Sequence, residues 1–181
     1  MPSPTDSWHI RAASAADASA LARFGADCFR RAYGADSRPE DVEAHVHAHY
    51  SPARQGREIS DPDGVFLVAT ADDVIAGYAY LRQVPPPPCV TSRRRMEINR
   101  FYLAPETHGR GLAQQLMVAA LAAAAGRGAE GVWLTVWERN PRGIAFYLKS
   151  GFRDVGETVF QVGSDPQRDR VMERLPGAFP G

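Results

Sequence analysis

The sequence predicts a single domain of the α/β (α+β) class with a mixed sheet, and three observations favour this class. The chain has 181 residues, close to the size of one domain. Helix-like and strand-like segments intermingle along it, as they do when helices pack on a sheet. Hydrophobic residues make up 44% and charged residues 23%, a balance typical of a globular chain and not of a disordered one.

The first third of the chain predicts a short strand followed by helices. Residues 8–12 read as the strand. Ser14 is a plausible N-cap with Asp17 in the first turn, and the apolar positions beyond keep helical spacing. Pro39 suits the first position of a second helix. We expect helices at residues 15–33 and 39–50, and a short one ending near Ile59.

The middle of the chain predicts a hairpin and one more strand. Residues 65–70 and 74–82 are the two arms of the hairpin, joined by a turn at Asp72 and Asp73. The four consecutive prolines at 85–88 require an extended loop. Residues 96–103 form the next strand.

The second half alternates helices and strands. Residues 112–125 form a long alanine-rich helix, and the β-branched and aromatic residues of 132–137 form a strand. Asn140 and Pro141 open a helix to about residue 150, and Gly151 ends it. We expect two closing strands at residues 152–162 and 170–175.

Composition excludes several classes of protein. The net charge is zero, which argues against a chain that coats nucleic acid or anionic membrane. Two cysteines are too few for a disulfide framework and favour a reducing compartment. The start lacks the features of a signal peptide, and no apolar run is long enough to span a membrane. We therefore expect a soluble, cytoplasmic protein with neither nucleic-acid nor membrane partners.

The most informative feature is a glycine-containing turn between a strand and a helix, at residues 97–117. Free backbone N–H groups and a helix N-terminus meet there, which makes an anion site suited to phosphate. A dinucleotide fingerprint would need a glycine where Gln114 stands, and the Gly-Lys-Ser/Thr of a P-loop is absent. A third pattern, Gln/Arg-x-x-Gly-x-Gly/Ala, matches residues 108–113, read as HGRGLA.

Together with a second block, this loop resembles the GNAT superfamily of acetyl-CoA-dependent N-acetyltransferases. The block at residues 137–152 is similar to the family's Asn-x-x-Ala-x-x-x-Tyr-x-x-x-Gly-Phe segment, with Asn140, Tyr147, Gly151 and Phe152 in register. His108 in place of Gln or Arg, and Gly143 in place of Ala, depart from the pattern. The resemblance covers residues 8–176, and the ends at 1–7 and 177–181 are expected to be flexible. Within the superfamily, the sequence is most similar to the PaiA-type bacterial spermidine/spermine N-acetyltransferases.

The resemblance implies a GNAT fold, with a mostly antiparallel sheet of about seven strands flanked by helices on both faces. It implies an N-acetyltransferase that moves the acetyl group of acetyl-CoA directly to a primary amine, a polyamine or another small amine, without a metal. A homodimer stays open. The residues implied in cofactor binding are Phe101, Tyr102, Leu103, His108, Gly109, Arg110, Gly111, Leu112, Ala113, Asn140, Arg142 and Tyr147.

Two side chains are candidates for the chemistry. Tyr147 is the expected general acid, because a phenol pKa of about 10 exceeds the roughly 8.5 of a thiol. Glu97 is the candidate base, directly or through a water, or otherwise an orienting carboxylate. Strand alternation predicts that Glu97, Asn99 and Phe101 share one face. Asn140 can cap its helix, contact the pantetheine arm, or do both.

Other readings stay open beside this one. The acceptor could be a protein N-terminus, a lysine or an aminoglycoside, and the protein could be a CoA-binding sensor without catalysis. His45, His47 and His49 lack a third metal ligand, so we expect a solvated helix face and no metal. Residues 93–113 carry five arginines and two glutamates, and residues 154–173 carry five acids and two arginines. These opposite charges suit an anionic cofactor and a cationic amine.

Overall fold

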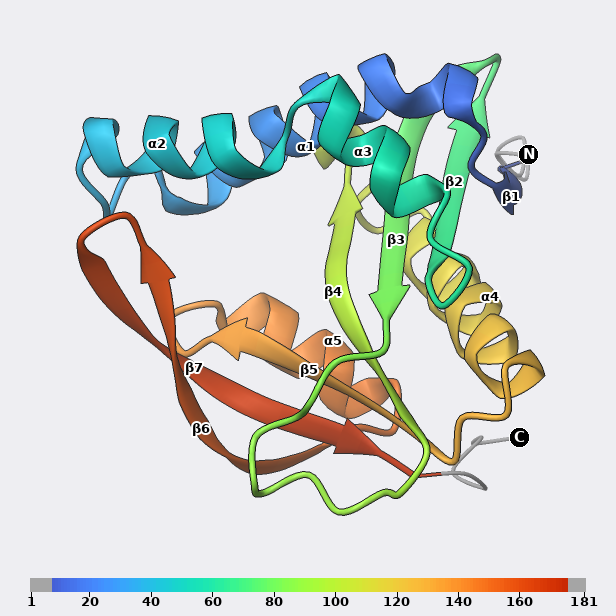
Figure 1. Ribbon diagram of the computed structural model, residues 1–181, viewed down its shortest axis with the longest axis vertical. Helices are drawn as coiled ribbons and strands as arrows, with labels where there is room; N and C mark the ends of the chain where they lie inside the picture. Colours follow the sequence, from blue (N-terminus) through green and yellow to red (C-terminus); the bar gives the residue numbers. More distant parts are fainter. Residues whose placement is uncertain (1–7, 176–181) are drawn as a thin grey trace.

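A computed structural model describes residues 8–175 (Figure 1). Within them, seven strands form one sheet in the order β1-β2-β3-β4-β5-β7-β6. Only β4 and β5 run parallel, so the expected mixed and mostly antiparallel sheet is confirmed. The expectations for residues 1–7 and 177–181 lie outside the described residues. The strands are β1 His9–Ala12, β2 Val65–Ala71, β3 Val74–Arg82, β4 Arg95–Leu103, β5 Gly131–Trp137, β6 Arg153–Val162 and β7 Asp165–Arg174.

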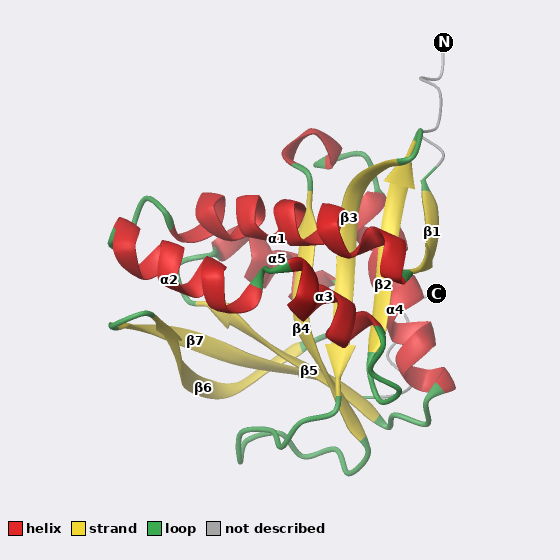
Figure 2. Cartoon of the chain, turned by 45° about the horizontal axis from the view of Figure 1, so that its top comes forward, coloured by secondary structure: helices red, strands yellow, loops and turns green. Residues whose placement is uncertain are grey.

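Five α-helices flank the described sheet. The helices α1, α2 and α3 cover one face, whereas α4 and α5 lie on the other (Figures 1 and 2). None of the helices in residues 8–175 is long and apolar enough to cross a membrane. The helices are α1 Ala18–Tyr33, α2 Pro39–His49, α3 Pro52–Ile59, α4 Leu112–Gly126 and α5 Pro141–Lys149, with short 3₁₀ turns at Ala15–Asp17 and Pro105–Thr107.

Most element boundaries agree with the sequence-based expectation to within one residue, and two differ by more. The first helix starts with a 3₁₀ turn, in which the Ser14 N–H donates to Asp17 at 2.7 Å and Arg11 donates to both oxygens of the same carboxylate at 2.8 Å. The last strand begins at Asp165 and not at residue 170, because a tight turn at Gly163 (φ +56°) lets the polar start of β7 pair with β6. Strand pairing overrides the weak strand signal of those polar residues.

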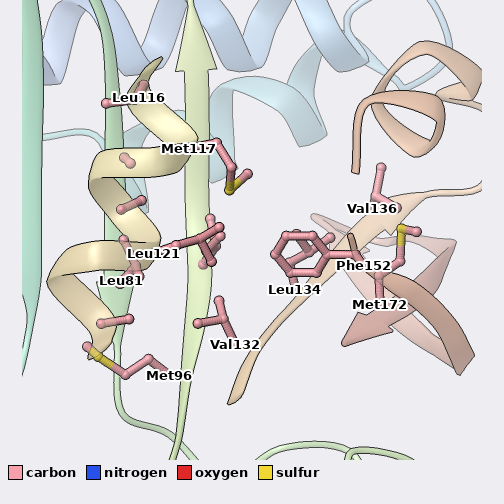
Figure 3. Packing of buried hydrophobic residues seen from close by; sticks show 14 residues of the cluster. Leu81, Met96, Leu116, Met117, Leu121, Val132, Leu134, Val136, Phe152 and Met172 are labelled. Carbon is pink, nitrogen blue, oxygen red and sulfur yellow. The ribbon is translucent and has the colours of Figure 1, made fainter. Parts of the chain in front are cut away.

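The main hydrophobic core joins both halves of the sheet to α4. Leu116 and Met117 of α4 are almost fully buried, and they belong to the same cluster as Leu134 of β5 and Phe152 (Figure 3). Burying side chains of this kind stabilises a fold by about 1.5–3 kcal/mol each. The core therefore holds β4 and β5 in a fixed relation, which matters because the site lies between them.

Candidate active site

The two central strands pair at one end and separate at the other. Pairing of β4 with β5 joins Arg95–Glu97 to Gly131–Trp133 and goes no further, and the strands then diverge (Figure 1). A cavity of about 1030 Å³ occupies this region, and its wall includes residues of β4, β5, α1, α5 and the glycine loop. The second half of β4 therefore has no paired strand on the side of β5.

A β-bulge at Asn99 changes which side chains of β4 share a face. Arg100 pairs with Tyr80 and Ile98 pairs with Leu81, so Asn99 has no partner on β3. Ile98 and Phe101 consequently both face the core with α4, although strict alternation would separate them. The expectation that Glu97 and Phe101 share a face is therefore wrong, because one extra residue reverses the alternation.

Two backbone amides of β4 point into the gap. The Ala104 N–H donates to Ala76 of β3 at 2.8 Å, and the alternation of an antiparallel ladder directs the Tyr102 N–H to β3 as well. The N–H groups of Phe101 and Leu103 point the opposite way, where β5 has already separated. Of the three β4 residues that the resemblance implies in cofactor binding, Phe101 and Leu103 therefore direct their backbone N–H groups into the gap, whereas the Tyr102 N–H is directed to β3.

The glycine loop has the conformation that an anion site needs. Gly109 and Gly111 have φ of +76° and +85°, a region that other residues adopt only with strain. Together with His108 and Ala113 they line the cavity at the start of α4. An added Cβ on Gly109 would meet no atom within 4 Å, so the loop is open on that side. The loop can hold a pyrophosphate by its N–H groups and the helix N-terminus.

Two other residues of the loop turn away from the cavity. The Arg110 guanidinium lies over the Trp8 ring, 5.6 Å from its centroid, and the Leu112 side chain is fully buried beside Ala69 and Ala76. Neither lines the cavity. Any contact that they make with an anion in the loop must come from their backbone.

The helix α5 forms the opposite wall. Asn140 caps it, since its side chain accepts from the Gly143 N–H at 2.9 Å, which confirms the capping role. A Cβ on Gly143 would lie 2.7 Å from the Asn140 side-chain nitrogen, so the cap packs closely on this glycine. Arg142 also lines the cavity, and burial together with its charge lowers the pKa of His108. The mouth at the loop is thus cationic.

Tyr147 lies further along α5 and faces the cavity. Its ring packs edge-on against Phe101, at 6.4 Å between centroids, and against Phe152 at 5.8 Å. Burial raises the pKa of the phenol above its usual 10. Tyr147 therefore keeps its proton at neutral pH and can donate it to a group that gains negative charge.

Glu97 has a different environment. It is buried, it does not line the cavity, and it accepts from Arg82 of the neighbouring strand at 2.5 Å. Arg82 itself does line the cavity. The carboxylate thus fixes an arginine of the wall and does not face the cavity itself.

Another part of the cavity wall contains residues that we did not predict to be in the site. Tyr33 of α1 packs between Trp137 of β5, at 5.4 Å, and Phe160 of β6, at 6.0 Å. Asp169 of β7 lies directly across the sheet from Trp137 and is only 3% exposed. Burial raises its pKa from the usual 3.8 to about 6. In the sequence, Asp169 stands in the acidic stretch 154–173 and is one of the residues that resemble the PaiA-type N-acetyltransferases, but neither signal predicted that it lines the site.

The α2 histidines are not all solvated. His45 stacks on Phe29 at 4.1 Å, and both His45 and His49 line the cavity, whereas His47 is exposed. The expectation of a solvated helix face is therefore wrong for His45 and His49, because α2 packs beside α1. Within residues 8–175 no group of three side chains could hold a metal ion.

The charge pattern of the cavity differs from that of the linear sequence. Of the five arginines in residues 93–113, only Arg100 lines the cavity, and it pairs with Glu58 of α3 at 2.5 Å. Arg31 of α1 and Arg142 are the arginines whose charges act on His108. The cationic mouth is therefore assembled from segments remote in sequence, and not from the basic stretch.

Comparison with known proteins agrees with this geometry. The model of the acetyltransferase (GNAT) family matches residues 27–152. An uncharacterized N-acetyltransferase of Mycobacterium tuberculosis is 37% identical over 158 residues, covering 87% of this chain and 97% of that protein, and its Mycobacterium bovis counterpart matches equally. An uncharacterized N-acetyltransferase of Lactobacillus delbrueckii subsp. lactis is 29% identical over 148 residues, covering 82% of this chain and 86% of that protein.

A solved structure with bound ligand is also similar. The crystal structure of PaiA N-acetyltransferase from Thermoplasma acidophilum in complex with coenzyme A has a TM-score of 0.76 and is 25% identical, covering 93% of this chain and 99% of that chain. The splayed strands, the glycine loop and these matches agree with one another. The chain belongs to the GNAT acetyltransferase family and is an acetyl-CoA-dependent acyltransferase.

Proposed function

We propose that this protein transfers the acetyl group of acetyl-CoA directly to a primary amine, within a ternary complex, and that the acceptor is a polyamine or another small amine. One observation carries the proposal. The gap between β4 and β5, the glycine loop and Tyr147 all border the same cavity. The similarity to PaiA N-acetyltransferase in complex with coenzyme A supports the acetyl donor. The choice of a small amine as acceptor rests on the sequence resemblance to the PaiA-type spermidine/spermine N-acetyltransferases.

The residues present fit acetyl-CoA, which supplies an acetyl group activated as a thioester. His108, Gly109, Gly111 and the backbone at Ala113 bind its pyrophosphate, with Arg142 beside them. Asn140 borders the path from the loop to the gap and can contact the pantetheine arm in addition to capping α5.

The backbone of β4 performs the electrostatic part of the reaction. The N–H groups of Phe101 and Leu103 donate to the carbonyl oxygen, which gains negative charge as the amine attacks. Fixed donors of this kind need no reorganisation during the reaction, and removing one typically costs a factor of about 10²–10³ in rate.

Tyr147 and Glu97 handle the protons. Tyr147 donates its phenolic proton to the departing thiolate and regains one from the nitrogen, which loses its second proton as the neutral amide forms. The raised pKa of the phenol keeps Tyr147 protonated between turnovers. Glu97 accepts a proton from the acceptor ammonium. The proton passes through a water, because the Glu97 carboxylate is bound to Arg82 and does not reach the cavity. An amine of pKa about 10.4 must lose this proton before it can attack.

A thiol-release assay over a panel of amines tests the proposal. Spermidine, spermine, amino acids, aminoglycosides and peptides with a free N-terminus or lysine are each supplied with acetyl-CoA, and initial rates are measured at varied concentrations of both substrates. We expect the highest kcat/KM for a polyamine or small amine and intersecting kinetics of a ternary complex. Preference for a peptide or an aminoglycoside would assign a different acceptor. Acetyl-CoA binding in calorimetry, without thiol release from any amine, would identify a CoA-binding sensor instead.

A further inference from the structure

Asp169 is a buried carboxylate that no part of the proposed reaction uses. It is 3% exposed, yet it lines the cavity. It lies directly opposite Trp137 of β5, so the two side chains are on the same face of the sheet. The Thr135 side chain hydrogen-bonds to the carboxyl, while Oδ1 has no hydrogen-bond partner among the described residues. Leaving a charged oxygen buried and unpaired is costly, so such a position calls for an explanation.

No cation of the described chain neutralises this carboxylate. Within residues 8–175, no arginine or lysine forms an ion pair with Asp169, and the nearby Glu138 adds negative charge. Four of the six arginines that line the cavity pair with other acids, namely Arg139 with Asp36, Arg82 with Glu97, and Arg54 and Arg100 with Glu58. The other two, Arg31 and Arg142, act on His108 at the glycine loop.

The surroundings of Asp169 are aromatic. The rings of Tyr33, Trp137 and Phe160 all line the cavity beside it, and Tyr33 contacts the other two. The carboxylate charge is close enough to Tyr33 to raise the pKa of that phenol further than burial alone. A negative charge bordered by aromatic faces attracts an organic cation, since the ring faces are themselves negative.

We propose that Asp169, with the rings of Tyr33, Trp137 and Phe160, forms the subsite that binds an ammonium group of the acceptor. The ligand is an alkylammonium, whose charge pairs with the carboxylate and whose carbon chain lies on the rings. This inference rests on the proposed function only in assigning the cation to the acceptor. It adds a specificity-determining residue at the end of the cavity away from the glycine loop.

The pair Asp169→Asn and Asp165→Asn tests the subsite by equilibrium binding. Asp165 lies on the same strand, is outside the cavity wall, and gives the same change of charge. Spermidine, n-butylammonium and neutral 1-butanol are titrated into the full-length protein with saturating CoA, followed by calorimetry. We expect Asp169→Asn to weaken both ammonium probes at least about thirtyfold, as truncating one partner of a buried charge pair does. Asp165→Asn should bind them like wild type, and 1-butanol should show no dependence on Asp169.

Tryptophan fluorescence tests whether the ammonium probe binds beside Trp137. Trp137 lies directly opposite Asp169, so an ammonium probe should change its emission, and Trp137→Phe should abolish that change. Equal affinity of the ammonium probes for wild type and Asp169→Asn would overturn the proposal, as would failure of both to bind wild type.

Kinetics separate this proposal from the proposed function. For an acceptor that is turned over, Asp169→Asn should raise the KM of the amine far more than it lowers kcat. If no amine releases thiol but ammonium binding still depends on Asp169, the acetyl-transfer proposal fails and the subsite stands. If acetyl transfer proceeds and the KM of the amine is the same in Asp169→Asn as in wild type, only the subsite proposal fails.

Discussion

Replacing Asp169 with asparagine should make the protein more resistant to unfolding at neutral pH than at acid pH, relative to wild type. Burial raises the pKa of this carboxyl from 3.8 to about 6. A folded-state pKa above the unfolded value means that the folded protein holds the proton more tightly. The ionised form of Asp169 therefore opposes folding. This cost is absent below the unfolded pKa, grows between the unfolded and the folded pKa, and is fully present above the folded pKa.

The magnitude follows from the size of the pKa shift. A difference of about two units at about 1.4 kcal/mol per unit gives a cost near 3 kcal/mol when the group is fully ionised. At about pH 4.5 the same linkage gives only about 1 kcal/mol. The stability difference between Asp169→Asn and wild type should thus widen by about 2 kcal/mol between about pH 4.5 and about pH 7.5. The amide itself adds an offset that does not depend on pH.

Urea unfolding of both proteins at several pH values measures this difference. The half-buried His45, whose pKa is lowered to about 4 by burial and by His49, titrates in the opposite direction, but it is present in both proteins, so its contribution cancels. Asp165→Asn controls for loss of one negative charge from β7. A difference that stays constant with pH would refute the reasoning, and so would an equal widening in Asp165→Asn.

Three further predictions concern the site. Tyr147→Phe should lower kcat by a factor of about 10²–10⁴ and leave the acetyl-CoA Kd unchanged in calorimetry, and unchanged turnover would remove the phenol from the mechanism. In wild type, we expect kcat/KM plotted against pH to reach a plateau below the amine pKa, and Glu97→Gln should remove this plateau, so that activity keeps rising toward the amine pKa. A pH profile of the variant like that of wild type would leave Glu97 only the role of orienting Arg82. Gly109→Ala and Gly111→Ala should each cost about 1–2 kcal/mol of stability in urea unfolding, because both glycines have positive φ, and should weaken acetyl-CoA binding. Gly56→Ala is their control, since this helical position has open space and ordinary φ, and should stabilise the protein by up to about 1 kcal/mol.

Local features of the site could be predicted from sequence because neighbouring residues encode them. Gly109 and Gly111 adopt the left-handed conformation that only glycine tolerates well, and Asn140 caps α5 through its own side chain. The strand before the loop and the helix after it follow from apolar periodicity. These features depend on backbone sterics and on hydrogen bonds within a few residues, so a short window of sequence contains them.

The face of a strand and the partners of a charge could not be predicted in this way. A single unpaired residue, Asn99, reverses the alternation of β4 and separates Glu97 from Phe101. Arg110, which by sequence belongs to the phosphate loop, lies over Trp8 near the other end of the chain. Register and side-chain direction are decided by packing against β3 and the core, which involves residues far away in sequence.

The sequence by itself determined the family, the glycine loop and the phenol of Tyr147, since each is a local pattern with a local physical cause. Only the tertiary structure decided which side chains meet at the proposed acceptor subsite. Tyr33 of α1, Trp137 of β5 and Asp169 of β7 meet at one end of the cavity because three separate elements converge there. Burial, which turns Asp169 from an ordinary acid into one of pKa about 6, is a property of that convergence and not of any segment alone.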